Sequence, residues 1–289
     1  MDDGAIKLSD VHIRLPKCTP IRLAEQFRYP NAKITYATIS RKADKWFVSI
    51  RCQTQDKQML SKTNKTIGVD VGVREYADSD GNLYPVPRSY RSGQRRLRRL
   101  QQSVSRKVKG SSNRRKAVVK VARQHLRISD VRNNWLHNLT IKLVRENDTI
   151  AIEDLNVKGM LKNCRLAKSI SDASFGEFRR QLEYKCQWYG RTLVVADRHF
   201  PSSKTCSGCG AKAKRMPLHV RGWGCDNCGA QHHRDINAAV NLKNLAANSA
   251  VSACGEFSPL LGCQSDVQLS TSTKQELSDK PQPLVAERR

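Results

Sequence analysis

Thr66-Ile-Gly-Val-Asp70 and Thr149-Ile-Ala-Ile-Glu153 are short apolar runs that each end in a carboxylate. Runs of this length and composition predict buried strands, and we expect both to lie in one sheet with their acids at the same edge. A third acid, Asp235, directly precedes the helical pattern of residues 236–246 and is expected to open that helix beside the same edge. The sequence therefore predicts an α/β fold in which three carboxylates meet.

Three carboxylates from separate elements suit a centre for divalent metals. Phosphodiester hydrolysis needs an activated water and a stabilised leaving oxygen, and two Mg²⁺ ions about 4 Å apart supply both. Taken singly, Asp70 could also end a strand at a turn, and Asp235 could cap a helix. Asp154 follows Glu153, but side-chain alternation along a strand sends it to the other face. We therefore expect Asp70, Glu153 and Asp235 to hold magnesium, and we leave Asp154 out.

Four cysteines occur in the spacing Cys206-x2-Cys209-x15-Cys225-x2-Cys228. Paired C-x2-C turns bring four thiolates onto one tetrahedral ion, most often zinc, and leave no position open for water. The zinc site is therefore predicted to be structural rather than catalytic. Two nearby histidines, His232 and His233, are not expected to be ligands, because four cysteines already complete the shell.

The chain is strongly basic, with 52 Lys and Arg against 26 Asp and Glu and a formal net charge of +26. This excess indicates a polyanionic partner, because neutralising phosphates releases counterions. A membrane surface is less favoured, since no amphipathic anchor helix accompanies the charge. No apolar run reaches the ~18 residues of a membrane span, and the first residues are acidic where a signal peptide is cationic. We expect an intracellular nucleic-acid-binding protein without a membrane partner.

Residues 88–132 hold sixteen Lys or Arg and one acid, Asp130, and are predicted to form two helices separated near Gly110. The second helix is expected to run to about Glu146, because apolar residues recur along it at helical spacing. The cationic faces of these helices predict contact with phosphates. The residues expected to contact nucleic acid are Arg95, Arg96, Arg99, Lys107, Lys109, Arg114, Arg115 and Lys204.

Weaker patterns fill the rest of the chain. Residues 33–39 and 46–50 read as two strands around a polar turn, which are too few to enclose a core and predict part of a small β-barrel. Ser174-Phe-Gly-Glu177 has the form of a capping box and is expected to open a helix. Residues 192–196 predict a further strand, and the composition beyond residue 247 predicts a disordered tail.

Several motifs together resemble the OrfB/TnpB family, transposon-encoded RNA-guided nucleases that are relatives of the type V CRISPR effectors. The motifs are Gly68-Val-Asp70-Val-Gly72, Ile152-Glu153-Asp-Leu-Asn156, Phe200-Pro-Ser-Ser-Lys204-x-Cys206 and His232-His-Arg-Asp235-Ile-Asn-Ala-Ala. The resemblance implies a ribonuclease H-like (RuvC-like) mixed sheet in which the three acids match the family's metal ligands. It also implies that the cysteine module is a zinc ribbon for the target nucleic acid.

The resemblance further implies a division of the chain into domains. We expect a partial wedge-type β-barrel (1–60), a RuvC-like nuclease domain (61–200) with a basic helical insertion (88–146), the zinc ribbon (201–230), the final helix of the nuclease domain (231–247) and the tail (248–289). Two departures from the family stand out. His233 occupies a position that usually carries Asp, and the opening barrel strands and helical recognition lobe of the family are missing.

The function implied by the resemblance is a Mg²⁺-dependent DNA endonuclease of a transposable element. Its partners would be a DNA target and a guide RNA from the transposon end, in a prokaryotic cytoplasm and close to the nucleoid; the residues indicate no particular protein partner. The alternative is a truncated derivative that binds RNA or DNA without cutting. The three acids favour the enzyme, and the short N-terminus favours the binding protein. The older label, transposase, would require strand transfer, for which no residue argues specifically.

Overall fold

The computed structural model describes residues 6–254, except for residues 10, 16, 28, 30, 31, 54–58, 214, 215 and 218. The last helix, α6 (Arg234–Cys254), extends beyond residue 247, where the tail was expected to begin. The remainder of the predicted tail, residues 255–289, lies outside the described residues. No helix in the described part of the chain is both long and apolar enough to cross a membrane.

A five-stranded mixed sheet forms the centre of the fold, with the strand order β10-β9-β6-β7-β8. Strands β6, β9 and β10 run parallel to one another, while β7 and β8 continue the sheet in antiparallel fashion. The apolar runs predicted as strands are confirmed, since they form β6 and β9. The strands are β6 (Thr66–Val71), β7 (Glu75–Asp78), β8 (Leu83–Pro85), β9 (Thr149–Glu153) and β10 (Thr192–Ala196).

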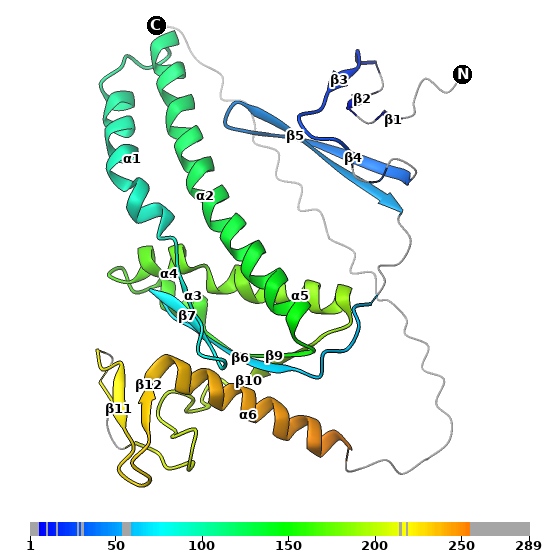
Figure 1. Ribbon diagram of the computed structural model, residues 1–289. Helices are drawn as coiled ribbons and strands as arrows, with labels where there is room; N and C mark the ends of the chain where they lie inside the picture. Colours follow the sequence, from blue (N-terminus) through cyan, green and yellow to red (C-terminus); the bar gives the residue numbers. More distant parts are fainter. Residues whose placement is uncertain are drawn as a thin grey trace, which may run out of the picture.

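Helices cover both faces of this sheet (Figure 1). Helices α2 (Ser112–Glu146) and α5 (Phe175–Tyr189) lie on one face, and α6 lies on the other. The larger core lies under α2 and α5, where Tyr76 is fully buried and its hydroxyl donates to the carbonyl of Ala173 at 2.6 Å. A smaller apolar cluster lies under α6. The result is an α/β/α arrangement that buries β6 and β9 on both faces, as continuous apolar strands require.

Gly68, two residues before Asp70, allows α6 to approach β6 at backbone distance. A Cβ atom at this position would lie 2.0 Å from the carbonyl oxygen of Ala239 and 2.6 Å from the backbone nitrogen of Lys243. Real Cβ atoms do not tolerate such contacts, and helix backbone cannot move aside as a flexible side chain can. The absence of a side chain at Gly68 therefore fixes how closely the helix that carries Asp235 lies against the strand that carries Asp70.

Replacing Gly68 with alanine should destabilise the fold by about 3 kcal/mol, the upper end of the usual cost of overpacking, because the obstructing atoms are backbone. The free energy of unfolding in urea is the measurement. Gly176 provides the matched control, since it lies near the start of α5 and a Cβ there meets nothing within 4 Å. Gly176→Ala should leave stability unchanged or slightly raised, and an equal loss in both variants would contradict the close-packing argument.

The basic segment forms two helices, as the sequence predicted. Helix α1 (Ser89–Ser105) and helix α2 are separated at Gly110, and the Ser111 side chain caps α2 by accepting from the Arg114 backbone nitrogen at 3.2 Å. The start of α1 is capped from outside, because Asp172 accepts the backbone N–H of Tyr90 at 2.8 Å. Two short helices were not predicted, α3 (Val157–Leu161) and α4 (Ala167–Ala173).

The predicted capping box at Ser174 is wrong. Ser174 takes a left-handed conformation with φ 58°, and its hydroxyl donates to the carbonyl of Ser171 rather than accepting from the helix that follows. Helix α4 ends at this residue and α5 begins directly after it, so Ser174 serves as the sharp corner between two helices. Glu177 is engaged by Arg180 and Gln181 instead of reaching back to the backbone.

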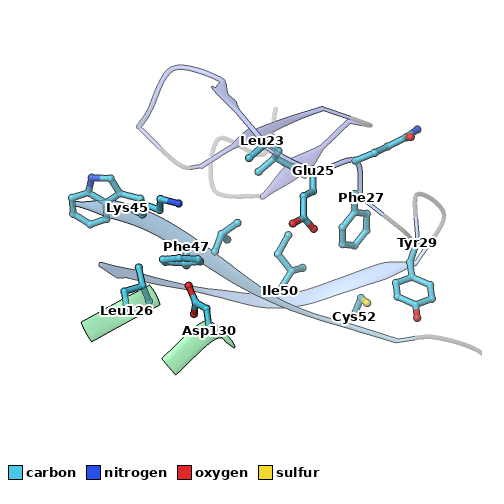
Figure 2. A pocket seen from close by; sticks show the side chains of 14 residues that line it. Leu23, Glu25, Phe27, Tyr29, Lys45, Phe47, Ile50, Cys52, Leu126 and Asp130 are labelled. Carbon is cyan, nitrogen blue, oxygen red and sulfur yellow. The ribbon is translucent and has the colours of Figure 1, made fainter. Parts of the chain in front are cut away.

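The N-terminal strands form two separate sheets rather than one barrel within the described residues. Strands β1 (Lys7–Leu8), β2 (His12–Arg14) and β3 (Ile21–Arg22) make one sheet, and β4 (Lys33–Lys42) and β5 (Lys45–Gln53) make a hairpin. An open, largely apolar groove of about 830 Å³ lies between them, bounded by Leu126 and Asp130 of α2 (Figure 2). The hairpin prediction is confirmed, whereas the barrel remains a prediction.

Candidate metal centres and nucleic-acid surface

The four cysteines of the C-x2-C pairs converge, with their sulfur atoms all within 4.8 Å of one another. The Sγ atoms of Cys206 and Cys228 lie 3.7 Å apart, and those of Cys209 and Cys225 lie 3.6 Å apart. A tetrahedral zinc ion with Zn–S bonds of about 2.3 Å requires thiolates about 3.8 Å apart. The cluster therefore has the dimensions of a four-thiolate zinc site.

Both halves of the cysteine cluster use the same turn. Gly210 donates its backbone N–H to the carbonyl of Cys206 at 2.9 Å, and Gly229 donates to that of Cys225 at 2.8 Å. Both glycines have positive φ, 76° and 73°, which a side chain would oppose. Gly208, which precedes the second cysteine of the first pair, does not share this conformation. Two short strands, β11 (Gly222–Gly224) and β12 (Gln231–His233), complete the module.

A hydrogen bond beside the cluster favours a thiolate at Cys209. The side chain of Asn227 donates to the sulfur of Cys209, and this hydrogen bond is the largest cause that lowers the pKa of Cys209 to about 6. His232 lies with its Nε2 atom 3.0 Å from the Cys206 sulfur. This histidine therefore contacts a sulfur atom of the cluster without joining the four sulfurs around the metal position. Metal-bound thiolates accept such hydrogen bonds, which orient and tune them.

The sheet register brings two of the three predicted acids together. Val69 pairs with Ile152 in the parallel ladder, so Asp70 and Glu153, the next residue on each strand, lie side by side at the carboxyl ends of β6 and β9. Asp235 lies in the first turn of α6, the helix that packs across these strands. Strands β6 and β9 and the start of α6 thus bring these residues to one edge of the sheet, and their role as metal ligands remains a prediction.

The pKa of Asp70 reflects the proximity of the other two acids. Burial is the largest cause that raises the pKa of Asp70 well above its usual value, and the negative charges of Glu153 and then Asp235 raise it further. Because Coulomb interactions fall off with distance, this coupling places the three carboxylates in one neighbourhood. The surplus of negative charge fits a site that receives cations, and it meets the chemical requirement for magnesium, a hard ion that prefers carboxylate oxygens.

Two contacts with the acids were not anticipated from the sequence. The hydroxyl of buried Ser202 donates to a carboxylate oxygen of Glu153, and the Nη1 atom of Arg221 lies 2.7 Å from both carboxylate oxygens of Asp235. Asp154, which the sequence placed on the other face of its strand, pairs instead with Arg179 at 2.5 Å and Arg198 at 2.7 Å. These contacts orient the side chains of Glu153 and Asp235.

Asparagines of α6 fasten the acid site to the cysteine module. Asn237 accepts the backbone N–H of Ser207 at 2.9 Å and donates to the carbonyl of Thr205 at 2.7 Å. Asn241 donates to the carbonyls of Ser202 and Thr205, each at 2.7 Å. The sequence signal for these residues is their spacing of four, which places Asn237 and Asn241 on one face of α6. They hold the segment with Ser202 and the first cysteine pair against the helix that carries Asp235.

The carboxylates of Asp70, Glu153 and Asp235 are not among the tight clusters of possible ligand atoms in the described part of the chain. Among the described residues, two groups have ligand atoms that all lie within 4.8 Å of one another, namely the four cysteines and the set Glu75, His233 and Asp235. Three like charges repel one another without a cation between them, and Arg221 already engages Asp235.

The predicted nucleic-acid residues lie mostly on the surface. Arg95, Arg96 and Arg99 project from α1, Lys107, Lys109, Arg114 and Arg115 surround the α1–α2 connection, and Lys204 precedes the first cysteine pair. Six of the eight are exposed, while Lys107 and Arg114 are half-buried. In the described part of the chain none of the eight forms an ion pair with an acid. Their charges are therefore not neutralised within the fold.

Comparisons with known proteins match these features. Residues 49–164 match the family OrfB_IS605, described as "Probable transposase", and residues 175–242 match the "Cas12f1-like, TNB domain". The second match covers α5, β10, the cysteine module and the start of α6, with Asp235. The two matches thus cover the strands that carry Asp70 and Glu153, the cysteine module and the start of α6.

Two relatives and one solved structure carry the comparison further. A Streptomyces pristinaespiralis protein named "Putative RNA-guided DNA endonuclease" is 46% identical over 88% of this chain. The Escherichia coli K12 protein named "Putative RNA-guided DNA endonuclease InsQ" is 33% identical over 80%. The "Cryo-EM structure of the Cas12f1-sgRNA-target DNA complex" shares the fold, with a TM-score of 0.52 and 18% identity over 75% of this chain and 47% of that chain.

These matches confirm the resemblance to the OrfB/TnpB family, since one part of the chain matches the OrfB_IS605 model and another matches the Cas12f1-like TNB model. The mixed α/β fold with its mixed sheet is likewise confirmed. The chain spans 62% of the length of the Streptomyces relative and 62% of the Escherichia coli relative.

Proposed function

We propose that this protein is a Mg²⁺-dependent endonuclease of a transposable element that an RNA guide directs to a DNA target. The observation that carries the proposal is the electrostatic coupling of Asp70 to Glu153 and Asp235 at the carboxyl edge of the sheet, where burial first, and then the charges of these two acids, raise the pKa of Asp70. The relatives named RNA-guided DNA endonucleases support the same activity. The mixed sheet with helices on both faces is the frame expected of a RuvC-like, ribonuclease H-type nuclease.

In this proposal the three carboxylates hold two magnesium ions, which activate a water molecule and stabilise the leaving oxygen when bound. The chain itself fixes the geometry. Ser202 orients Glu153 through its hydroxyl, the register of β6 and β9 sets Asp70 beside Glu153, and the close contact of α6 with β6 delivers Asp235. Arg221 balances the charge of Asp235 while no metal is bound and must release it for that carboxylate to become a ligand.

The cysteine module is proposed to be a zinc ribbon that contacts the target nucleic acid, with zinc in a purely structural role. Four thiolates leave no open coordination position. Lys204 and Arg221 border the module, and both side chains are exposed. The basic helices α1 and α2 are proposed to bind RNA or DNA phosphates. Base pairing between guide and target would then supply sequence specificity, while the protein supplies backbone contacts.

Magnesium affinity should rise with pH, and Asp70 is the reason. Its pKa lies well above the usual 3.8, so a proton competes with the metal over a pH range in which ordinary carboxylates are already ionised. The affinity should increase until the pH passes the raised pKa and then level off. Without metal, the free energy of unfolding should fall as pH rises through the same range, because the folded state retains a proton that the unfolded state releases.

Isothermal titration with Mg²⁺ at a series of pH values measures this linkage. Asp70→Asn removes a proposed ligand and should weaken Mg²⁺ binding, and the binding that remains to Glu153 and Asp235 should lose most of its pH dependence because position 70 no longer titrates. Glu183→Gln is the matched control, because Glu183 is an exposed acid on α5 that pairs only with Arg179 among the described residues. A pH profile that stays the same in Asp70→Asn would show that another group controls metal binding.

Charge reversal of Arg95, Arg96 and Arg99 tests the proposed phosphate contacts. The logarithm of the binding constant falls with the logarithm of salt concentration by about 0.9 per neutralised phosphate of duplex DNA. Replacing the three arginines with glutamate should therefore flatten the slope by about two units or more. Arg180→Glu serves as control, since Arg180 is also exposed but is engaged by Glu177. An unchanged slope in the triple variant would show that these three arginines are solvated and do not contact phosphates.

The experiment that tests the function as a whole is purification of the protein from its host, followed by sequencing of the RNA that accompanies it. Plasmid DNA bearing the sequence matched by that RNA should then be cut in the presence of Mg²⁺. Bound RNA without cleavage would instead identify a non-cleaving RNA- or DNA-binding derivative. Cleavage that does not depend on the sequence of the bound RNA would contradict guidance by RNA but would still support a nuclease.

A further inference from the structure

Glu75, His233 and Asp235 form a cluster of potential metal ligands beside the acid triad. One carboxylate oxygen of each acid and one ring nitrogen of the histidine all lie within 4.8 Å of one another. Glu75 and His233 are half-buried and Asp235 is buried, so all three side chains are partly or fully withdrawn from solvent. Only Asp235 belongs to the triad, and the proposed nuclease chemistry uses neither Glu75 nor His233.

Three separate elements build this cluster. Glu75 begins β7, the strand next to β6, while His233 ends β12 and Asp235 lies in the first turn of α6. Strand β12 leads directly into α6 (Figure 1), so two of the three ligands lie within three consecutive residues. The pairing of His233 with Gly222 in the β11–β12 ladder fixes its backbone. The cluster is therefore held by the sheet on one side and the cysteine module on the other.

His233 supplies an independent observation. Its Nδ1 atom is buried and has no hydrogen-bond partner among the described residues. A buried ring nitrogen without a partner is costly, because it has lost water and gained nothing in return. Beside two carboxylates, an imidazole is well suited to donate a lone pair to a cation. The environment of His233 thus indicates a ligand that the protein atoms alone do not provide.

The geometry points to a binding site for one divalent transition-metal ion, held by Glu75, His233 and Asp235. We propose this ion in addition to the zinc of the cysteine cluster and the magnesium of the triad. Imidazole nitrogen with two carboxylates suits ions such as Mn²⁺, Co²⁺ or Zn²⁺, whereas Mg²⁺ prefers oxygen alone. Three protein ligands leave coordination positions open for water or a phosphate oxygen. The inference rests on the proposed nuclease function only in that both metal sites would use Asp235. The set of three ligands is argued from the geometry of the cluster.

Metal binding at this site depends on the position of the Arg221 side chain. Its Nη1 atom lies 2.7 Å from both oxygens of Asp235, so the guanidinium and the metal ion compete for the same carboxylate. Arg221 is exposed and flanks β11, where it is free to turn toward solvent or toward a phosphate group. Metal binding and release of Arg221 are therefore coupled, and any polyanion that draws Arg221 away strengthens the metal site.

Titration of zinc-loaded protein with Co²⁺, followed by visible absorption, tests the proposal. Exchange of Co²⁺ into the cysteines produces thiolate charge-transfer bands, which separates that event from binding to nitrogen and oxygen. Glu75→Gln and His233→Ala should each weaken the nitrogen–oxygen site at least about tenfold, the usual consequence of damage to a metal site. Arg221→Ala should tighten binding by about tenfold or more, because a charge-assisted competitor is removed.

The controls are Glu183→Gln and His199→Ala, an exposed acid and an exposed histidine outside the cluster, which should leave Co²⁺ affinity unchanged. Zinc content and thermal unfolding establish that each variant is folded. Asp70→Ala separates the two proposals, because it should abolish cleavage and keep this Co²⁺ site. Equal affinity in wild type, Glu75→Gln and His233→Ala would overturn the inference. So would loss of Co²⁺ binding in Asp70→Ala with retention in Glu75→Gln, or unchanged affinity in Arg221→Ala.

Discussion

Replacing Asp70 with alanine should abolish Mg²⁺-dependent DNA cleavage, with a loss of at least ~1,000-fold, as is usual when one member of a cooperating catalytic set is removed. Asp70 lies at the centre of the site, next to Glu153 in the sheet register and within the electrostatic reach of Asp235. Without its carboxylate, the remaining pair lacks the oxygen atoms to hold two ions. Glu153→Ala and Asp235→Ala should give similar losses, and the three losses should not add.

The measurement is single-turnover cleavage of a matched DNA with the RNA guide bound. RNA binding and thermal unfolding should stay close to wild type. Without metal, Asp70→Ala should be slightly more stable than wild type, because it lacks a carboxylate whose ionised form is disfavoured by burial and by neighbouring negative charges. Asp154→Asn is the matched control, since Asp154 adjoins Glu153 in sequence but pairs with Arg179 and Arg198. Cleavage that persists in all three alanine variants would show that these acids do not hold the catalytic metals.

Replacing Cys225 with serine should empty the zinc site and unfold the cysteine module. Zinc binding to such modules is worth about 10–16 kcal/mol, and much of that free energy folds the segment. Cys225 is buried in the cluster, and its neighbours in the chain form β11. Because Arg221 and His233 flank the strands of this module, its unfolding should also disturb the surroundings of Asp235 and reduce cleavage.

Zinc analysis of the purified protein and limited proteolysis within residues 206–230 measure this effect. The control is Cys164→Ser, because Cys164 is exposed and lies outside the cluster. We expect the control to keep one zinc per chain and resist proteolysis as wild type does. A full complement of zinc in Cys225→Ser would show that three thiolates, or a different ligand set, suffice.

The elements of this fold that could be predicted from sequence are those set by local pattern. The apolar runs before Asp70 and Glu153 are long enough to be strands and too continuous to face water, so their burial followed directly. The C-x2-C spacings likewise predicted the convergence of four sulfurs, because two such turns direct their thiolates at one ion. The split between α1 and α2 at Gly110 followed from a composition that no helix interior favours.

The features that escaped prediction depend on contacts between distant parts of the chain. Ser202 meets Glu153 across 49 positions and Arg221 meets Asp235 across 14, and neither pairing has a periodic signature. Nothing in the local sequence distinguishes Glu75, which the fold places beside His233. Ser174 failed as a cap for the same reason, since α4 reaches it first and bends the chain there. Such partners are decided by packing rather than by local preference.

The late position of α6 in the chain has a consequence for biosynthesis. The strands with Asp70 and Glu153 leave the ribosome well before Arg234–Cys254, and Gly68 remains uncovered until that last helix arrives. A nascent chain that ends before α6 therefore contains Asp70 and Glu153 but lacks Asp235, and one face of β6 is not yet covered. Contacts so far apart in sequence form slowly, so the three carboxylates of the proposed centre come together only after α6 has been synthesised and has packed against β6.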